Sequence, residues 1–189
     1  MLPNMKNLDW KTLKSEYLFR RPWLTARRDT CELPDGRIMD EYYVLEYPTF
    51  VHVIAVTREG EMVLIRQYRH GLGQTCFEIV AGCAEKGEEP LVAAQRELLE
   101  ETGYAGGEWH ESMVFSCNAS AMNNLAHSFI AVGVQRVADQ HLDPNEDIEV
   151  HVLSQERVKE MLQQGEFMQA SMIAALYKFF YEQKGLCGY

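Results

Sequence analysis

Runs of hydrophobic residues divide the middle of the chain into predicted strands. Residues 50–57 read FVHVIAVT, nearly all apolar and rich in β-branched side chains, which is typical of a strand buried on both faces. Residues 58–60 give a turn signal, and residues 61–68 (EMVLIRQY) predict the returning strand. A shorter run at 77–80 ends at Ala81 and Gly82. The pattern predicts a sheet with buried central strands.

Helices are predicted where apolar residues recur at helical spacing between start and stop signals. Pro90 suits the first turn of one helix, and Gly103 stops it. Ser154 can cap a second helix running to about residue 163, and a third is expected over about 169–182. With further strands predicted at 113–116, 128–134 and 149–153, the fold class is α/β or α+β, a mixed sheet with a few helices on it.

The N-terminal part differs in charge from the rest of the chain. Seven of the 18 basic side chains lie in the first 28 residues, opposed there by two acidic ones. The strand-like runs 23–32 and 37–45 flank Pro34-Asp35-Gly36, which predicts a hairpin. We expect two parts: residues 1–46, a basic segment with a hairpin, and residues 47–189, which hold the remaining elements.

Composition and charge narrow the function. A chain of 189 residues with 47% hydrophobic and 24% charged residues is ordinary for a globular protein, which excludes fibrous and disordered classes. The net charge of −10 argues against nucleic acid as a partner, since such binding needs a basic surface. No apolar run approaches the length of a membrane span, and the first ten residues lack the apolar core of a signal peptide.

The cysteines predict no cross-links. Five occur, an odd number, and none has Cys-x-x-Cys spacing, so a disulfide framework or a structural zinc site is not expected. Buried thiols in a reducing cytoplasm are the favoured interpretation.

A cluster of carboxylates in residues 82–104 (GCAEKGEEPLVAAQRELLEETGY) is the strongest chemical signal. Glu97, Glu100 and Glu101 lie three or four residues apart, so a helix places them on one face. Hard oxygen ligands of this kind favour Mg²⁺ or Mn²⁺, and Mg²⁺ often takes substrate phosphates as further ligands. The alternative is a solvated helix face with an Arg96–Glu100 ion pair.

The full spacing of this segment resembles the Nudix box. It fits Gly-x5-Glu-x7-Arg-Glu-U-x-Glu-Glu-x-Gly-U, where U is a bulky apolar residue. A chance match of seven fixed positions is on the order of 10⁻⁸ per starting position, which outweighs the solvated-face alternative. Tyr104 departs slightly from the strict pattern, which has an aliphatic residue there. The matching residues are Gly82, Glu88, Arg96, Glu97, Leu98, Glu100, Glu101, Gly103 and Tyr104.

The resemblance implies the Nudix fold, an α/β/α sandwich around a mixed sheet. It also implies hydrolysis of a nucleoside diphosphate linked to another group, with Mg²⁺ or Mn²⁺ as cofactor. Carried over by position, Glu97 and Glu101 are the main metal ligands and act in catalysis. Glu100 and the backbone carbonyl of Ala81 are further ligands. The resemblance gives Arg96 and Glu88 a structural role, and Gly82 and Gly103 a role in the loop and the helix exit.

Outside the box, the chain resembles the ADP-ribose and nucleoside-diphosphate-sugar pyrophosphatases. Residues 65–70 (IRQYRH), 78–82 (EIVAG) and 146–150 (EDIEV) carry this resemblance. The basic N-terminal segment with its hairpin is similar to the extra N-terminal sheet of that subgroup. The resemblance implies that this sheet builds a homodimer and helps to hold the substrate.

Three residues before the box are candidates for substrate binding: Arg66, Arg69 and Glu78. An arginine can bind a diphosphate through two hydrogen bonds. Strand alternation puts Arg66 and Arg69 on opposite faces, so at most one points into the site, and family position favours Arg69. The alternative for either arginine is a surface ion pair. Glu78 either binds a substrate hydroxyl or pairs with an arginine.

Metal-assisted hydrolysis also needs a general base beyond the box, to take a proton from the attacking water. The resemblance places this base on a loop after the core strands. Glu146 fits that place best, with Asp147 and Glu149 as close rivals and a solvated loop acid as the alternative. The expected products are a nucleoside monophosphate and a sugar phosphate.

The identity of the substrate stays open at this stage. Many ADP-ribose-specific members have a Ser-Pro-Gly-like segment after the box, whereas residues 116–120 here read SCNAS. GDP-mannose, a dinucleoside polyphosphate or a coenzyme are alternative substrates, and a sensor that binds without cleaving is a further alternative. The intact box glutamates favour an enzyme. Tyr17, Phe19 and Trp23 are candidates for stacking a base, although core or dimer packing is the favoured use of each.

Overall fold

The computed structural model describes residues 5–21 and 24–186, with side chains up to residue 183. The chain forms two compact units. One consists of the residues up to Tyr47 together with residues 118–124, and the other consists of residues 48–117 and those from Leu125 onward.

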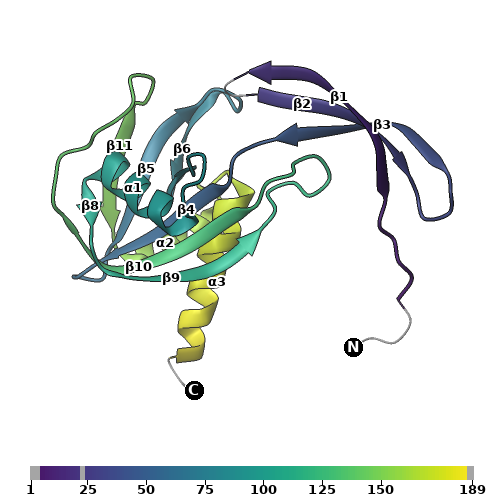
Figure 1. The fold of residues 1–189 in the computed structure, drawn as a ribbon. Coiled ribbons are helices and arrows are strands. Elements are labelled where there is room, and N and C mark those ends of the chain that lie inside the picture. The colour runs from purple at the N-terminus through teal and green to yellow at the C-terminus, as the bar shows by residue number, and fades with distance from the viewer. Residues whose placement is uncertain (1–4, 22–23, 187–189) are drawn as a thin grey trace. The chain divides into compact units, whose positions relative to one another are not determined.

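The first unit is a three-stranded antiparallel sheet, ordered β1 (Lys11–Arg21), β2 (Leu24–Glu32) and β3 (Ile38–Glu46) (Figure 1). The predicted hairpin between β2 and β3 is confirmed, with Leu33 N–H donating to the Arg37 carbonyl at 2.9 Å. The sequence did not predict β1 as a strand. All its side chains are exposed and its apolar residues are mixed with charged ones, so it lacks the long apolar run that marks the core strands.

The second unit contains an eight-stranded sheet. Its main order is β11-β5-β4-β10-β8, while β6 pairs with β5, β7 with β4 and β9 with β10. β10 runs parallel to β4 and the other pairs are antiparallel, so the sheet is mixed, as predicted. The strands are β4 (Phe50–Thr57), β5 (Met62–Arg69), β6 (Gln74–Glu78), β7 (Val80–Cys83), β8 (Tyr104–Ala105), β9 (Glu108–Phe115), β10 (Ala126–Arg136) and β11 (Ile148–Leu153).

Helices cover both faces of this sheet. On one face, α1 (Pro90–Thr102) packs through Leu98 onto a core that includes Val53 and Ile65. On the other, α2 (Gln155–Gln164) and α3 (Ala170–Leu186) pack onto a core that includes Ile54 and Leu64. Alternate residues of β4 and β5 thus enter opposite cores, which explains their nearly continuous apolar sequence. The predicted α/β/α sandwich is confirmed (Figure 1).

The ends of the helices follow the signals in the sequence. Ser154 Oγ accepts a hydrogen bond from Arg157 N–H at 3.2 Å, and Gly165 ends α2 in a left-handed conformation. Gly103 ends α1 with φ of 75°. A β-carbon at Gly103 would also lie 2.2 Å from the Ala138 carbonyl oxygen, so two independent constraints demand glycine there.

The cysteines depart in part from the expectation of buried thiols. Cys31 and Cys76 are buried, but Cys83 is half-buried and Cys117 is exposed. Cys117 lies just after β9, where the chain leaves the sheet, so no core covers it. All four of these cysteines are free. Within the described part of the chain, no helix is long and apolar enough to cross a membrane.

Candidate active site

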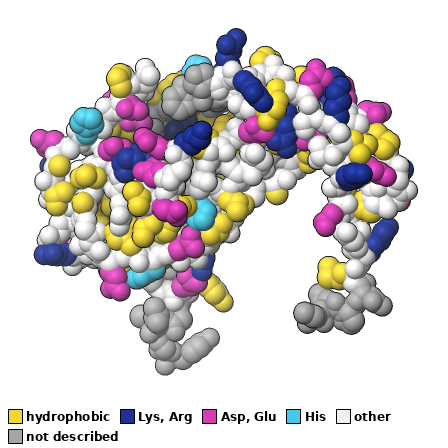
Figure 2. Space-filling view, viewed as in Figure 1, with side chains coloured by type: hydrophobic (Ala, Val, Ile, Leu, Met, Phe, Trp, Pro, Cys, Tyr) yellow, Lys and Arg dark blue, Asp and Glu magenta, His cyan; other side chains and the backbone are white. Residues whose placement is uncertain are grey.

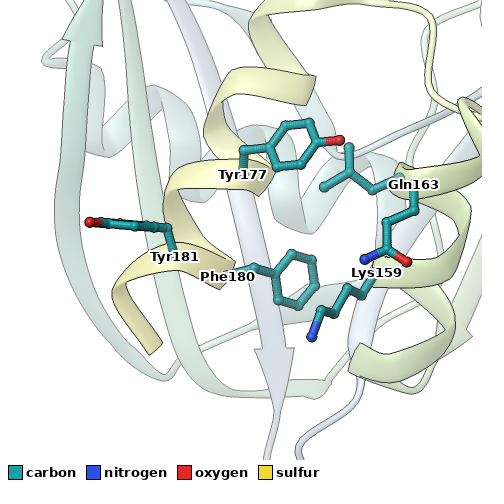
Figure 3. A pocket seen from close by; sticks show the side chains of 6 residues that line it. Lys159, Gln163, Tyr177, Phe180 and Tyr181 are labelled. Atoms are coloured by element: carbon teal, nitrogen blue, oxygen red, sulfur yellow. The ribbon is translucent and has the colours of Figure 1, made fainter. Parts of the chain in front are cut away.

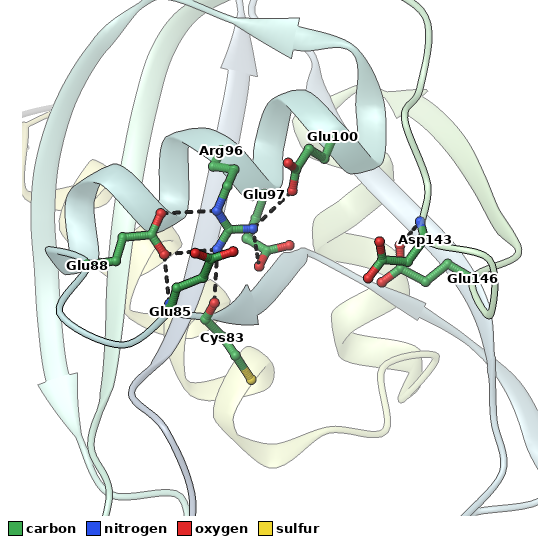
Figure 4. Close-up of polar contacts among 8 residues, drawn as sticks. All are labelled: Cys83, Glu85, Glu88, Arg96, Glu97, Glu100, Asp143 and Glu146. Atoms are coloured by element: carbon green, nitrogen blue, oxygen red, sulfur yellow. Dashed lines mark hydrogen bonds and ion pairs between the residues drawn. The ribbon is translucent and has the colours of Figure 1, made fainter. Parts of the chain in front are cut away.

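The loop between β7 and α1, with the helix itself, presents the carboxylates of the box (Figure 4). Pro90 occupies the first turn of α1, as predicted, because it needs no N–H partner there. Glu89 precedes it in an extended conformation and its side chain makes no cap hydrogen bond. The following turns carry Arg96, Glu97, Glu100 and Glu101 along the helix.

Arg96 is the hub of the loop and helix. Its Nε and Nη2 donate to the two oxygens of Glu88 at 3.0 Å each. Nη1 donates to Glu97 Oε1 at 3.0 Å and Glu100 Oε2 at 2.9 Å, and Nη2 also donates to the Cys83 carbonyl at 3.0 Å. All five N–H donors of the guanidinium are therefore used. Glu88 in turn accepts from Glu85 N–H at 2.8 Å.

The orientation of Glu97 depends on Gly82. A β-carbon at Gly82 would lie 2.1 Å from Glu97 Cδ and 2.2 Å from Oε1, so the carboxylate occupies the space that a side chain would fill. Only 14% of the Glu97 side chain is exposed. Burial raises the pKa of Glu97, and its contact with Arg96 opposes that shift.

Glu101 is the most buried acid of the box, with 4% exposure. Burial raises its pKa well above the ordinary value, and the charge of Glu97 adds to the shift. The backbone N–H of Ala81 donates to its carboxylate, yet Oε2 has no hydrogen-bond partner in the described part of the chain. An unpaired carboxylate oxygen in the interior is costly, and a cation would offset that cost.

These oxygens fit a hard divalent cation. The side chains of Glu97, Glu100 and Glu101, with the backbone of Ala81, offer oxygen alone, which suits Mg²⁺ or Mn²⁺ rather than zinc. Among the described residues, no three acidic, histidine or cysteine side chains already converge as a cation cage. Arg96 instead holds one oxygen each of Glu97 and Glu100.

The two predicted arginines separate as the strand alternation requires. On β5, Val63 and Ile65 enter the core beneath α1, so Arg69 belongs to that face and Arg66 to the other. Arg69 donates to Glu78 Oε1 at 2.7 Å and Oε2 at 2.5 Å. Two roles were expected for Glu78, binding a substrate hydroxyl or pairing with an arginine, and the structure contains the pair with an arginine.

Arg66 is instead part of an exposed ion pair. It donates to Glu149 Oε2 at 2.8 Å, across the ladder between β5 and β11. Ile148 and Val150 pack in the core beneath α1, so Glu149 lies on the face opposite the box. The structure therefore does not bring Arg66 or Glu149 to the carboxylates.

Glu146 lies in the loop before β11. Its Oε2 accepts a hydrogen bond from Asp143 N–H at 3.0 Å (Figure 4). The backbone N–H of Glu146 donates to the Asp143 carbonyl, and the two bonds together close a turn. The side chain is exposed, and its charge contributes to the raised pKa of Glu101. The charge of Glu146 therefore acts on a carboxylate of the box.

A cavity of about 280 Å³ adjoins the box. It is lined by Phe50, His52, Arg69, Ala81, Gly82, Cys83 and Gln169. The sequence analysis did not name His52 or Gln169. A signal for His52 was present, since it is the one imidazole within the otherwise apolar run 50–57.

A second hollow of about 150 Å³ lies between α2 and α3 (Figure 3). Aromatic and aliphatic side chains line it together with one lysine and one glutamine, and none of its lining residues is acidic. We therefore assign it no part in the chemistry. The lining residues are Lys159, Leu162, Gln163, Tyr177, Phe180 and Tyr181. On the face seen in Figure 2, acidic and basic side chains are interspersed.

The candidates for base stacking lie in the first unit. Tyr17 donates its hydroxyl to Glu46 at 3.2 Å, and the Arg20 guanidinium sits 3.6 Å from the centre of its ring. Phe19 is 56% exposed on β1. Trp23 falls outside the described residues.

Comparison with known proteins agrees with these observations. The NUDIX domain family matches residues 47–176, and the nucleoside diphosphate sugar hydrolase N-terminal domain matches residues 10–45. The chain is 32% identical over 173 residues to ADP-ribose pyrophosphatase of Bacillus subtilis (strain 168), covering 91% of this chain and 93% of that protein. It is 35% identical over 131 residues to methanol dehydrogenase activator of Bacillus methanolicus, covering 69% and 70% respectively.

A solved structure shares the fold of this chain. A crystal structure of ADP compounds hydrolase superposes with a TM-score of 0.83 at 21% identity, over 96% of this chain and 98% of that one. The likeness extends over both units, the N-terminal sheet included. From the box, its geometry and these matches, the chain belongs to the Nudix family and is a pyrophosphohydrolase of that family.

Proposed function

We propose that the chain hydrolyses the diphosphate of a nucleoside diphosphate sugar, with ADP-ribose as the first choice of substrate, and depends on Mg²⁺ or Mn²⁺. The products are a nucleoside monophosphate and a sugar phosphate. The observation that carries the metal requirement is Glu101, whose buried Oε2 lacks a partner beside Ala81. The relatives named above support the substrate class.

In this proposal, Glu97, Glu100 and Glu101, with the Ala81 carbonyl, hold the cation. A bound divalent ion neutralises diphosphate charge and makes a water more acidic. Arg96 fixes the directions of the box carboxylates, since all its donors are already committed. It therefore positions the glutamates and has no N–H left for the substrate.

Arg69 is proposed to bind the diphosphate. Its guanidinium lines the cavity with 37% of the side chain exposed, while Glu78 holds it from behind. A fixed guanidinium loses little freedom when a phosphate binds, so the pairing with Glu78 prepares Arg69 for this role.

Glu146 is proposed as the general base that takes a proton from the attacking water. Glu149 lies on the opposite face of the sheet, which leaves Glu146 and Asp147 of the three acids considered for this role. The charge of Glu146 acts on Glu101, which supports Glu146 over Asp147. Loss of a general base typically lowers rates by about 10²- to 10⁴-fold. We expect Glu146→Gln to lower kcat by that factor, and Glu149→Gln to leave kcat within about twofold.

A homodimer built through the N-terminal sheet is part of the proposal. β1 is an edge strand that is exposed along its whole length and carries exposed Leu13, Leu18 and Phe19. Exposed apolar edge strands tend to be covered by another chain. Sedimentation equilibrium would give twice the mass of the chain, and a monomer at micromolar concentration would refute this part.

The test of the activity is a panel of substrates with identified products. ADP-ribose, ADP-glucose, GDP-mannose and a dinucleoside polyphosphate are incubated with protein and Mg²⁺, then with a chelator, and separated by chromatography. Metal-dependent release of a nucleoside monophosphate from one diphosphate sugar supports the proposal. No turnover of any diphosphate sugar by folded protein would refute it.

A further inference from the structure

The cavity beside the box contains polar groups that the proposed metal site does not use. Gly82 and Cys83, the first residues of the box, form one wall. β4 contributes Phe50 and His52, and Gln169 stands immediately before α3. His52 alternates with Val51 and Val53 along β4, so its side chain lies on the α3 face of the sheet. Gly82 packs against the Glu97 carboxylate, and Arg69 belongs to the α1 face, so the cavity is lined from both faces and adjoins the place where the diphosphate would bind.

His52 is a buried polar side chain with one ring nitrogen unpaired among the described residues. It is 2% exposed, and its Nδ1 has no partner among the described residues. The ring of Phe115 stacks on it, with centroids 5.6 Å apart and an angle of 30° between planes, which fixes the imidazole. Burial lowers the pKa of His52 to about 4, so at neutral pH the ring offers one donor and one acceptor.

The strand next to His52 has a second unsatisfied group. Ser128 on β10 is the register partner of His52, is fully buried, and its Oγ has no partner. Native structures rarely leave two adjacent buried polar groups unpaired. Of these two side chains His52 lines the cavity, so a ligand bound there can supply a partner for its Nδ1.

The groups that line the cavity suit a neutral, hydroxyl-rich ligand. The proposed function assigns Arg69 to the diphosphate, and the two other polar side chains considered, His52 and Gln169, are uncharged donors and acceptors. The volume of about 280 Å³ is below that of typical sites for drug-sized ligands, which favours one sugar ring over a whole nucleoside.

We propose that this cavity binds the sugar of the nucleoside diphosphate sugar, and that His52 and Gln169 hydrogen-bond its hydroxyl groups. The inference rests on the proposed function and deepens it. The nucleoside half of the substrate then lies on the other side of the diphosphate, outside this cavity.

Binding of the separate products tests the assignment without turnover. Protein with ¹⁵N-labelled histidine is titrated with ribose 5-phosphate and, separately, with AMP, each with Mg²⁺, and imidazole nitrogen shifts are recorded. The His52→Phe variant assigns the His52 signals by their absence. We expect ribose 5-phosphate to shift them and AMP to leave them unchanged. A shift with AMP alone, or with neither, would overturn the proposal.

Turnover by variants gives an independent test. His52→Phe keeps a ring of similar shape without the polar nitrogens, and Gln169→Leu changes an exposed residue, so folding is not at stake in the second. Exposed Gln164→Leu at the end of α2 is the matched control. We expect His52→Phe and Gln169→Leu each to lower kcat/KM about tenfold or more relative to the control, because each variant loses a hydrogen bond to the sugar.

Substrates that differ only in their base show whether the cavity binds the sugar or the nucleoside. We expect His52→Phe and Gln169→Leu to lower kcat/KM by the same factor for ADP-ribose and for IDP-ribose, since both carry the same sugar. A loss that depends on the base, or none in either variant, would overturn the sugar assignment. Failure of the proposed function would look different, because the wild-type chain itself would then release no nucleoside monophosphate.

Discussion

The substitution Gly82→Ala should disturb the carboxylates of the box and leave the stability of the fold nearly unchanged. The added β-carbon would lie 2.1 Å from Glu97 Cδ, whereas ordinary contacts begin near 3.4 Å, so the carboxylate must retreat by more than 1 Å. The carboxylate is the free end of a flexible side chain, and the backbone of Gly82 needs no positive φ. The protein can therefore accept the methyl group by moving Glu97.

The two consequences differ in size. Displacement of a ligand by about 1 Å can lower activity about a hundredfold. The free energy of unfolding should change by less than about 1 kcal/mol, because the Glu97–Arg96 ion pair lost is weak and alanine stiffens the unfolded chain.

Gly87→Ala is the matched control, since Gly87 lies in the same loop. Its φ is +83° and a β-carbon there would meet open space. Alanine at Gly87 should cost about 1–2 kcal/mol of stability and leave activity near wild type. The assays are kcat/KM for ADP-ribose with Mg²⁺ and urea unfolding. Full activity in Gly82→Ala, or a loss explained by unfolding, would refute the reasoning.

Three further predictions concern residues that hold the site. Arg96→Lys should lower the free energy of unfolding by about 1–3 kcal/mol in urea, since lysine has three donors for five bonds, and an unchanged value would contradict the role of Arg96 as hub. Glu78→Gln should raise KM about tenfold with kcat little changed, because Arg69 loses its charged partner, and an unaltered KM would speak against a restrained Arg69. For His52, the unfolded state (ordinary pKa 6.5) binds a proton before the folded state (pKa about 4), so stability falls as pH drops from 7 to 5. The His52 share of that loss is about 2 kcal/mol, and urea unfolding of His52→Phe at both pH values should lack it.

Elements with strong local signals could be predicted from the sequence. β4 was expected over 50–57 and is found there, because its residues are buried on both faces. The hairpin and the helix started by Ser154 follow from turn and cap chemistry. β1 could not be found this way, because it has no buried apolar run and is defined by its pairing with β2.

The residues of the candidate site could be predicted from the sequence, whereas most of the contacts between them could not. The spacing of the box indicated the carboxylates and the roles of Arg96 and Gly82. It could not show that Arg96 engages Glu88, Glu97 and Glu100 together, since this depends on how the loop folds back onto the helix. His52 was missed because its unpaired nitrogen is a property of the packed core.

The most direct test of the account is AMP release from ADP-ribose, measured against Mg²⁺ concentration for the wild-type chain, Glu101→Gln and Glu89→Gln. Glu89 is the matched control, because it lies in the same segment with an exposed side chain that makes no cap hydrogen bond. The account predicts saturable dependence on Mg²⁺ in the wild-type chain and in Glu89→Gln, and a loss of about a hundredfold or more in Glu101→Gln. AMP release that persists with chelator, or a Glu101→Gln variant as active as Glu89→Gln, would contradict it.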